Sequence, residues 1–431
     1  MMPSSRFRAV LALCLVLGPP ALGAQDSIPQ GVRVGLTYDP SSRPGVFVTA
    51  VAGTNGDSVR AMLARDLDFG DRVTVISAEA GPPPTGKLNY DLYAKLGASA
   101  LVQASVTPQG SLHIAVHDIA AKRVLNVSDF AFNGTAPLSA SWRMVVHRAS
   151  DEVERWITSV RGIAATRVLF VRDQRLWIVD SDGANLVPVG VGGTALNPAW
   201  HPTGRYIAYT QMADDGTHIV VRDLTNGQSR RAPDLGGTNV TPTFSPDGST
   251  LVYSAGDDGT DLYAVAPFGG EAPRRVTVGR GSPSSSPSFS PDGRKIAYIS
   301  GRLGHPEVYI TDADGTNVEL LTESPSGERP YRTDPDWSPD GRHVAFTSQE
   351  GPNLQVMVIN VRDRRVRQLT GDARNENASW APDARHLVFT STRSGAKQLW
   401  VLDTESGRAR QLTRGAGVAR QAAWSPRMEQ P

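Results

Sequence analysis

The chain has 431 residues, 39% hydrophobic and 20% charged, with 44 basic and 43 acidic side chains and a formal charge of +1. This length exceeds what one hydrophobic core usually organises, so we expect two domains, or one domain beside a repeat array. The balanced charge and composition argue against a disordered tail, a nucleic-acid-binding surface and a polybasic membrane patch.

The first 24 residues have the pattern of a targeting segment. Two arginines precede an apolar run from Ala9 to Gly18, and small residues follow up to Ala24. Pro19 ends the run well short of the roughly 20 residues that a membrane span needs. We therefore predict a signal peptide over residues 1–24 and export with no direct membrane insertion. A retained membrane-anchoring helix is the alternative.

Cys14, the single cysteine, lies inside this leader. In a lipid-anchored protein it would be the modified residue, but Leu13 stands where a small residue is expected. Cleavage after Ala24 removes Cys14, so we expect a mature chain with no disulfide, thiol nucleophile or thiolate metal site.

Residues 25–160 predict an α/β domain in which helical spacing alternates with short apolar runs. We expect helices over Ser58–Leu67, Tyr90–Leu96 and Ser139–Val160. We expect strands over Val32–Tyr38, Val46–Val51, Val73–Ile76, Leu101–Val106, Leu112–His117 and Val127–Phe132. The buried stripe of the last helix should comprise Trp142, Val145, Val146, Ala149, Val153, Trp156, Ile157 and Val160.

After this domain, one phrase recurs along the chain: an aromatic residue, then Ser-Pro-Asp-Gly or a close variant, then a short apolar run. The copies begin at Trp200, Phe244, Phe289, Trp337, Trp380 and Trp424. They are about 44 residues apart, a period typical of a four-stranded propeller blade. Proline presets φ, aspartate bonds nearby amides and glycine accepts positive φ, so the phrase predicts a tight turn after the first strand.

The two ends of the repeat array predict how the ring closes. The last copy has room for little more than a first strand, whereas Arg167–Val171, Arg175–Val179 and Asn185–Val189 have the pattern of second, third and fourth strands. We therefore predict an all-β six-bladed propeller over residues 165–431. Its last blade combines three N-terminal strands with one C-terminal strand, which leaves no free sheet edge.

This order of parts resembles the TolB family: a signal peptide, a small α/β domain and a six-bladed propeller with Phe-Ser-Pro-Asp-Gly repeats. Leu96–Pro108 looks like the family's central strand entry, and His147–Val153 with Gly162–Arg167 looks like its connecting helix and first propeller strand. The resemblance covers essentially the whole mature chain. It implies a monomeric, non-enzymatic scaffold of the periplasmic Tol-Pal system, which supports envelope integrity and cell division.

Hydrolysis is the enzymatic alternative, because similar repeats occur in the propellers of prolyl-oligopeptidase-like hydrolases. Such an enzyme needs a serine nucleophile within Gly-x-Ser-x-Gly, and no such pentapeptide occurs here. We therefore expect no catalytic residue.

Metal chemistry in the propeller channel is a further alternative. The candidate ligands are His201, His305, His343 and His386. No paired-ligand spacing occurs among the eight histidines, and His343 and His386 hold a variable repeat position beside a turn, where we expect solvated side chains. Asp180–Gly183 and Asp312–Gly315 lack the calcium loop of about 12 residues and read as hairpin turns. We expect neither a metal nor a cofactor.

A polar residue stands three positions before each blade aromatic, where one blade crosses to the innermost strand of the next. These residues are Asn197, Thr241, Ser286, Asp334, Asn377 and Gln421. They predict a ring around the channel mouth, unless they are simply polar loop residues. The resemblance implies that this ring binds the peptidoglycan-associated lipoprotein Pal. Family members can carry an acidic residue where this chain has Ser286, so the contacts are expected to differ.

The resemblance assigns a second site to the mature N-terminus, residues 25–44, which in the family binds the inner-membrane-anchored protein TolA. The matching residues are Val32, Arg33, Val34, Tyr38 and Asp39. An edge strand with a loose leader is the structural alternative. For the whole chain, the alternative function is an exported propeller that binds another ligand, such as a peptide or a glycan.

Overall fold

The computed structural model describes residues 43–77, 86, 88–257, 259–279, 281–323 and 329–428. The chain divides into Met1–Gly35 and Leu36–Pro431, and the first of these units lies outside the described residues. The predicted strand Val32–Tyr38 lies outside them too and stays a prediction. Among the described residues, no helix combines the length and hydropathy required for a membrane span.

The described chain opens with a five-stranded sheet in the order β2-β1-β3-β4-β5. Its strands are β1 (Gly45–Val48), β2 (Thr74–Val75), β3 (Ala100–Val106), β4 (Ser111–Asp118) and β5 (Arg123–Ala131). Three helices accompany it: α1 (Gly56–Phe69), α2 (Tyr90–Lys95) and α3 (Ala140–Thr158). Strand β1 runs parallel to β2 and β3, and β3-β4-β5 form an antiparallel meander. The predicted helices and the five predicted strands within the described chain are confirmed.

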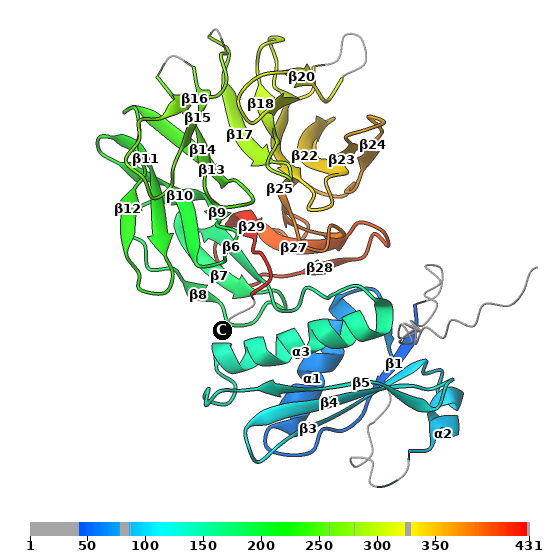
Figure 1. Cartoon of the computed structure of the whole chain (residues 1–431). Helices are drawn as coiled ribbons and strands as arrows, with labels where there is room; N and C mark the ends of the chain where they lie inside the picture. Colours follow the sequence, from blue (N-terminus) through cyan, green and yellow to red (C-terminus); the bar gives the residue numbers. More distant parts are fainter. Residues whose placement is uncertain are drawn as a thin grey trace, which may run out of the picture. The chain divides into compact units, whose positions relative to one another are not determined.

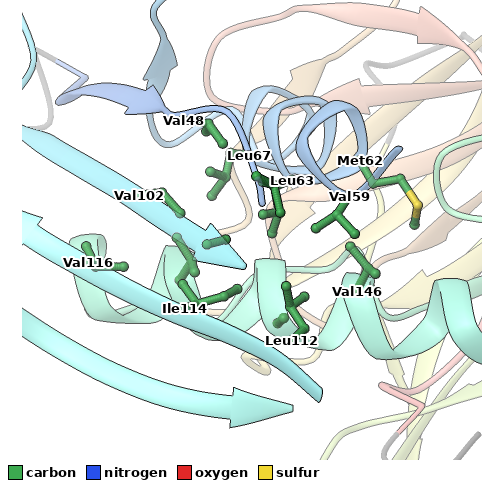
Figure 2. Close-up of a cluster of buried hydrophobic side chains, with 14 of the residues drawn as sticks. Val48, Val59, Met62, Leu63, Leu67, Val102, Leu112, Ile114, Val116 and Val146 are labelled. Carbon is green, nitrogen blue, oxygen red and sulfur yellow. The ribbon is translucent and has the colours of Figure 1, made fainter. Parts of the chain in front are cut away.

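Helices α1 and α3 pack on one face of this sheet (Figure 1). The sheet alternates, so Val46 and Val48 face the helices whereas Phe47 belongs to a smaller cluster with the rings of α2. Val59, Met62, Leu63 and Leu67 of α1 lie at helical spacing, as the sequence predicts, and face the sheet and α3 (Figure 2).

Most of the predicted stripe of α3 is buried: Trp142, Val145, Val146, Ala149, Val153 and Ile157. Trp156 is only partly buried, and Val160 is 41% exposed, so the prediction was wrong for Val160. The reason is that the helix ends at Thr158, and Ser159 turns the chain with φ 65°. Val160 therefore no longer follows the helical spacing.

Residues 167–424 form six four-stranded antiparallel sheets, the blades of a propeller (Figure 1). Blade 1 comprises β9 (Ala195–Trp200), β10 (Tyr206–Ala213), β11 (Gly216–Asp223) and β12 (Ser229–Arg231). Blade 2 comprises β13 (Thr238–Phe244), β14 (Leu251–Gly256), β15 (Asp261–Val265) and β16 (Arg274–Arg275). Blade 3 comprises β17 (Ser284–Phe289), β18 (Lys295–Ser300), β19 (Glu307–Asp312) and β20 (Glu319–Leu320).

Blade 4 comprises β21 (Arg332–Trp337), β22 (His343–Glu350), β23 (Asn353–Asn360) and β24 (Val366–Gln368). Blade 5 comprises β25 (Asn375–Trp380), β26 (His386–Ser391), β27 (Gln398–Asp403) and β28 (Ala409–Gln411). Blade 6 comprises β29 (Ala419–Trp424), β6 (Arg167–Arg172), β7 (Arg175–Asp180) and β8 (Val187–Pro188). In blade 6, Trp424 pairs with Val168 and Ala419 with Arg172. The predicted closure of the ring by a C-terminal strand is confirmed.

The recurring Ser-Pro-Asp-Gly phrase forms the turn between the first two strands of a blade. In blade 2, the hydroxyl of Ser245 donates to Asp247 Oδ1 at 2.5 Å and accepts from the Thr250 N–H at 3.0 Å. Gly248 has φ 74°, which favours glycine. Each turn is therefore held by its own side chains, which explains why this short phrase predicts the blade so well.

Candidate partner-binding site

The six predicted ring residues lie on the innermost strands of the six blades and share one backbone conformation. Their φ angles are 47° for Asn197, 53° for Thr241, 52° for Ser286, 51° for Asp334, 53° for Asn377 and 53° for Gln421. A register shift interrupts the pairing of each of these strands with its neighbour. The prediction placed them in crossover loops, whereas they sit within the strands, at β-bulges.

Left-handed backbone at a non-glycine residue costs about 1 kcal/mol or more, so the surrounding structure must stabilise it. Hydrogen bonds between adjacent blades do so here. The N–H of Asn197 donates to Gln421 Oε1 at 3.3 Å. The N–H of Ser286 donates to Thr241 Oγ1 at 3.2 Å. These bonds tie the ring residue of one blade to that of the next.

A second set of contacts lies two residues further along three of these strands, at Ser288, Asp336 and Ser379. The N–H of Trp380 donates to Asp336 Oδ2 at 2.7 Å, and its indole N–H donates to the Asp336 carbonyl at 3.1 Å. The N–H of Trp337 donates to Ser288 Oγ at 2.9 Å. The aromatics Trp337, Trp380 and Trp424 are thus each held by a side chain that follows the bulge in the preceding blade.

The six ring residues surround one channel cavity of about 260 Å³, together with the two residues that follow each of them. None of the four histidines weighed as channel ligands is among the described residues that line it. The walls offer hydroxyl, amide and carboxyl groups. This arrangement can bind a partner through hydrogen bonds and negative charge.

Two carboxyl groups face the cavity from blade 4. Burial raises the pKa of Asp334 to about 6, although the Asn377 amide donates to its Oδ2 at 2.6 Å. Burial also raises the pKa of Asp336 to about 6, against the hydrogen bond from the Trp380 N–H. Both groups are therefore mostly ionised at neutral pH and gain protons in mild acid.

The predicted N-terminal site residues Val32, Arg33, Val34, Tyr38 and Asp39 lie outside the described residues. The first described residue after them is Arg43. The guanidinium of Arg43 lies 3.2 Å from Asp71 Oδ1 and 3.9 Å from Asp403 Oδ2.

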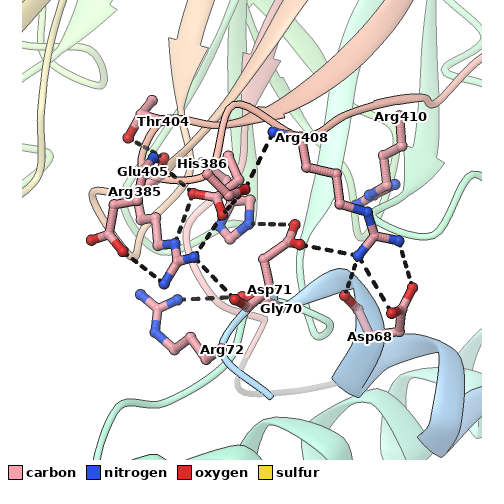
Figure 3. A network of polar contacts seen from close by, with 12 residues as sticks. Asp68, Gly70, Asp71, Arg72, Arg385, His386, Thr404, Glu405, Arg408 and Arg410 are labelled. Carbon is pink, nitrogen blue, oxygen red and sulfur yellow. Dashed lines mark hydrogen bonds and ion pairs between the residues drawn. The ribbon is translucent and has the colours of Figure 1, made fainter. Parts of the chain in front are cut away.

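Figure 3 shows a network of polar contacts between the end of α1 and blade 5 that the sequence did not predict. Arg43 borders this network through its contact with Asp71. Asp71 accepts from Arg408 at 3.0 Å, and its carbonyl accepts from Arg385 at 3.0 Å. His386 is fully buried there, so the expectation of a solvated side chain was wrong. The repeat places His386 beside a turn, as expected. The α/β region covers this turn in blade 5 but leaves the equivalent turn of blade 4 uncovered, so His343 is only half-buried.

The Asp180–Gly183 segment is a hairpin turn as predicted, since the Gly183 N–H donates to the Asp180 carbonyl at 2.8 Å. It also contacts helices of the α/β region: Asp182 binds Arg143 of α3 at 2.5 Å and Arg65 of α1. The sequence gives only a weak sign of this contact: two aspartates in a turn of the first propeller strands after α3. Nothing in that pattern indicates that Arg143 and Arg65 are the residues they bind.

Two groups of side chains lie close enough to share a metal ion, and both belong to these networks. They are Asp66, His147 and Asp182, and Asp71, His386 and Asp403. Arginines already bind the propeller carboxylates, Arg143 on Asp182 and Arg385 on Asp403. Because guanidinium groups neutralise these acids, the geometry is that of buried ion pairs.

Comparisons with known proteins agree with this architecture. The family model of the TolB β-propeller domain matches residues 154–428. The Tol-Pal system protein TolB of Gluconobacter oxydans is 26% identical over 239 residues, which cover 53% of this chain and 51% of that relative. The chain thus spans about half the length of this curated relative.

Solved structures show the same fold. TolB from Acinetobacter baumannii superposes with a TM-score of 0.77 at 22% identity, covering 89% of this chain and 97% of that one. Hydrazine synthase of Kuenenia stuttgartiensis has a TM-score of 0.52 at 15% identity, covering 62% of this chain and 47% of that one. The propeller alone is thus shared with proteins of other functions. With more than half of its residues matched by the family model, the chain belongs to the TolB β-propeller family.

Proposed function

We propose that this protein is a non-enzymatic scaffold of the Tol-Pal system in the periplasm. It binds a Pal-like peptidoglycan-associated lipoprotein at the channel mouth and a TolA-like inner-membrane protein through residues 25–44. It thereby links the inner-membrane Tol proteins to the outer membrane and supports envelope integrity and cell division. Export follows from cleavage of the leader over residues 1–24.

The observation that supports this proposal best is the gathering of six polar residues around one cavity. Each of them adopts positive φ at a bulge, and hydrogen bonds between neighbouring blades join the six in three pairs. Such a preordered polar mouth suits a partner segment that inserts along the propeller axis, because little conformational entropy is lost on binding. The Pal-like identity of this partner is our proposal, and membership of the TolB β-propeller family supports it.

Titration calorimetry with lipid-free Pal from the same source tests the ring. Asp334→Arg combined with Thr241→Arg adds bulk and reverses charge at the mouth. We expect the affinity to fall by about 1–3 kcal/mol if these are central contacts. The control is Glu271→Arg, because Glu271 is exposed in the β15–β16 turn at the opposite end of blade 2. Unchanged affinity in a folded ring variant would assign Pal to another surface.

Deleting residues 25–44 tests the second partner. We expect the deletion to abolish binding of the C-terminal domain of TolA and to leave Pal binding largely intact. If wild-type protein binds neither protein, the alternative is an exported propeller for another ligand. Binding of short peptides or glycans to the channel cavity then becomes the next measurement.

A further inference from the structure

The backbone of the ring is close to sixfold symmetric, because every blade presents the same bulge with the same backbone conformation. The ring side chains differ between blades, but a partner that recognised the ring backbone alone could dock in six rotational orientations. Whatever selects one orientation must therefore differ between blades. The loops at the ring end of the propeller differ strongly, and they divide the mouth into two unequal parts.

Blades 1 to 4 carry exposed apolar side chains at this end, in or beside the loops that join second to third strands and in the crossovers to the next blade. This apolar arc consists of Met212 (50% exposed), Leu235 (52%), Val278 (62%), Leu303 (53%) and Tyr331 (49%). Acidic residues accompany it, among them the exposed Asp214, Asp215, Asp257, Glu323 and Glu350. Exposed apolar side chains clustered on one end of a molecule indicate a contact surface.

Blades 5 and 6 are different at the same end. Their basic arc consists of Arg172, Arg374, Arg393, Lys397, Arg414 and Arg420. In the described part of these loops, Val418 is the one large apolar side chain that is well exposed. Glu376 neutralises part of the arc, since it pairs with Arg374 at 2.9 Å and with Lys397. Basic residues remain in excess, because only Asp173 and Asp372 add further negative charge there.

Two guanidinium groups of the basic arc are held by aromatic rings. Arg393 lies 5.2 Å from the ring centroid of Phe389 and 5.0 Å from that of Trp400. Arg172 lies 5.6 Å from Phe170 and donates to the Arg414 carbonyl at 3.2 Å. Stacked arginines lose less side-chain entropy when they bind a carboxylate, so these charges are already positioned for a partner.

We propose that the two arcs select a single docking orientation of the partner at the channel mouth. The partner surface carries acidic groups opposite blades 5 and 6 and apolar groups opposite blades 1 to 4. Charge complementarity steers it into this orientation during encounter, and burial of the apolar arc then slows its release. This inference rests on the proposed function, because it takes the Pal-like lipoprotein as the partner.

Association kinetics with lipid-free Pal test the steering. In Lys397→Glu combined with Arg414→Glu, we expect the association rate at low salt to fall about tenfold and to lose most of its salt dependence. The dissociation rate should change by less than about threefold. Arg414→Glu alone should give an intermediate association rate if the double variant folds poorly. Leu303→Ser should leave association unchanged and speed dissociation.

The control carries the same change of charge at the other end of the propeller: Arg342→Glu combined with Arg365→Glu. These side chains are 77% and 88% exposed and lie in turns of blade 4. If this control slows association as much as the basic-arc variant does, the association rate depends on the net charge of the protein and not on the basic arc. The proposal is then overturned. Failure of wild-type binding overturns the proposed function as well. Loss of binding in the ring variant, with no effect in the basic-arc variant, overturns only the orientation.

Photo-crosslinking reports the orientation directly. A benzoylphenylalanine replaces Leu303 in the apolar arc, or Ala416 in the exposed loop of the basic arc. A single orientation predicts that each position captures its own segment of Pal and that the two segments do not overlap. Capture of the same mixture of segments from both positions would show that the partner docks in several orientations.

Discussion

Asp71 and His386 meet across the boundary between the α/β region and the propeller, with Asp71 Oδ2 3.5 Å from His386 Nε2. The other imidazole nitrogen, Nδ1, lies 2.8 Å from Asp383 Oδ2 in the adjacent turn of blade 5. His386 is thus enclosed between a carboxylate from the end of α1 and a carboxylate from the propeller.

A second histidine repeats this arrangement nearby. His147 of α3 places Nδ1 2.8 Å from Asp66 of α1 and Nε2 3.8 Å from Asp182 of blade 6. All three side chains are buried. The end of α1 is therefore joined to two blades by two buried Asp-His-Asp bridges. Breaking a buried ion pair by removing one partner costs about 3–5 kcal/mol, which makes these bridges sensitive points of the fold.

The first prediction concerns the stability of the His386 bridge. Burial opposes the charged imidazole, but Asp383, Asp71 and Asp403 outweigh it and raise the pKa of His386 to about 9. Because the folded state favours the protonated form, this stabilisation is complete below the unfolded pKa of about 6.5 and is lost as pH rises through about 9. We expect His386→Gln to lower the free energy of unfolding, relative to wild type, by about 3 kcal/mol at pH 6 and by little at pH 9.5. Urea unfolding at the two pH values measures this difference.

The matched control is His343→Gln, at the same repeat position in blade 4, where the side chain is half-buried. It should change the free energy of unfolding little at pH 6, where His386→Gln has its full effect. The charged groups that face His386 include Arg385 and Arg72, which bind Asp403 and Asp383. Equal pH dependence in His386→Gln and wild type would show that these arginines, and not the imidazole, hold the bridge.

The second prediction concerns Glu154, a buried acid of α3 whose Oε1 lies 3.9 Å from Arg72 Nε. Burial raises the pKa of Glu154 to about 8 despite the charge of Arg72, and Asp151 adds to the rise. The fold opposes ionisation, so stability falls as pH rises from about 4.5 to about 8. We expect the free energy of unfolding of Glu154→Gln to equal that of wild type at pH 5 and to exceed it by about 3 kcal/mol at pH 9.

Chemical denaturation at these two pH values measures the effect of Glu154→Gln. Glu152→Gln on the same helix is the control, because Glu152 is more exposed and pairs with Arg155 and Arg161. A Glu154 variant that is less stable than wild type at pH 9 would mean that the Arg72 pair outweighs the burial of the carboxyl group.

The third prediction separates charge from hydrogen bonding in the channel. Asp336 accepts from the Trp380 N–H at 2.7 Å, so Asp336→Ala leaves that donor without its partner. We expect Asp336→Ala to lower the free energy of unfolding by about 1–3 kcal/mol, and Asp336→Asn, which keeps an oxygen acceptor, to lower it much less. Thermal melting at pH 7.5 compares the two variants. Equal losses would show that the N–H bond contributes little.

The propeller could be predicted from the sequence because its signals are local. Each Ser-Pro-Asp-Gly turn is held by side chains within the same phrase, as the bonds of Ser245 to Asp247 and Thr250 illustrate. The aromatic before the turn then marks the end of an innermost strand. Counting these phrases and the strands at the two ends was enough to predict six blades and the strand that closes them.

Long-range contacts could not be predicted in this way. The ring residues were expected at the crossings between blades, because they stand three positions before each blade aromatic, whereas bulges bring them into the innermost strands. The register shift between Val240 and Thr243 depends on pairing with the neighbouring strand and has no local sequence pattern. The burial of His386 depends on Asp71 of the α/β region, and no repeat in the propeller carries that information.

The last prediction concerns the closing strand β29. Its Trp424 indole N–H donates to Thr166 Oγ1 at 2.9 Å, and the Ser425 N–H donates to the Arg167 carbonyl at 2.9 Å. Removing residues 419–431 leaves β6 with a free edge, so we expect an opened ring that self-associates. Light scattering and thermal melting measure the outcome. Trp424→Ala should keep the strand but lower the free energy of unfolding by about 3–5 kcal/mol, because the indole side chain of Trp424 is buried. A control that lacks only residues 429–431 should behave as wild type. If the longer truncation stays monomeric with an unchanged melting temperature, β29 does not hold the ring closed.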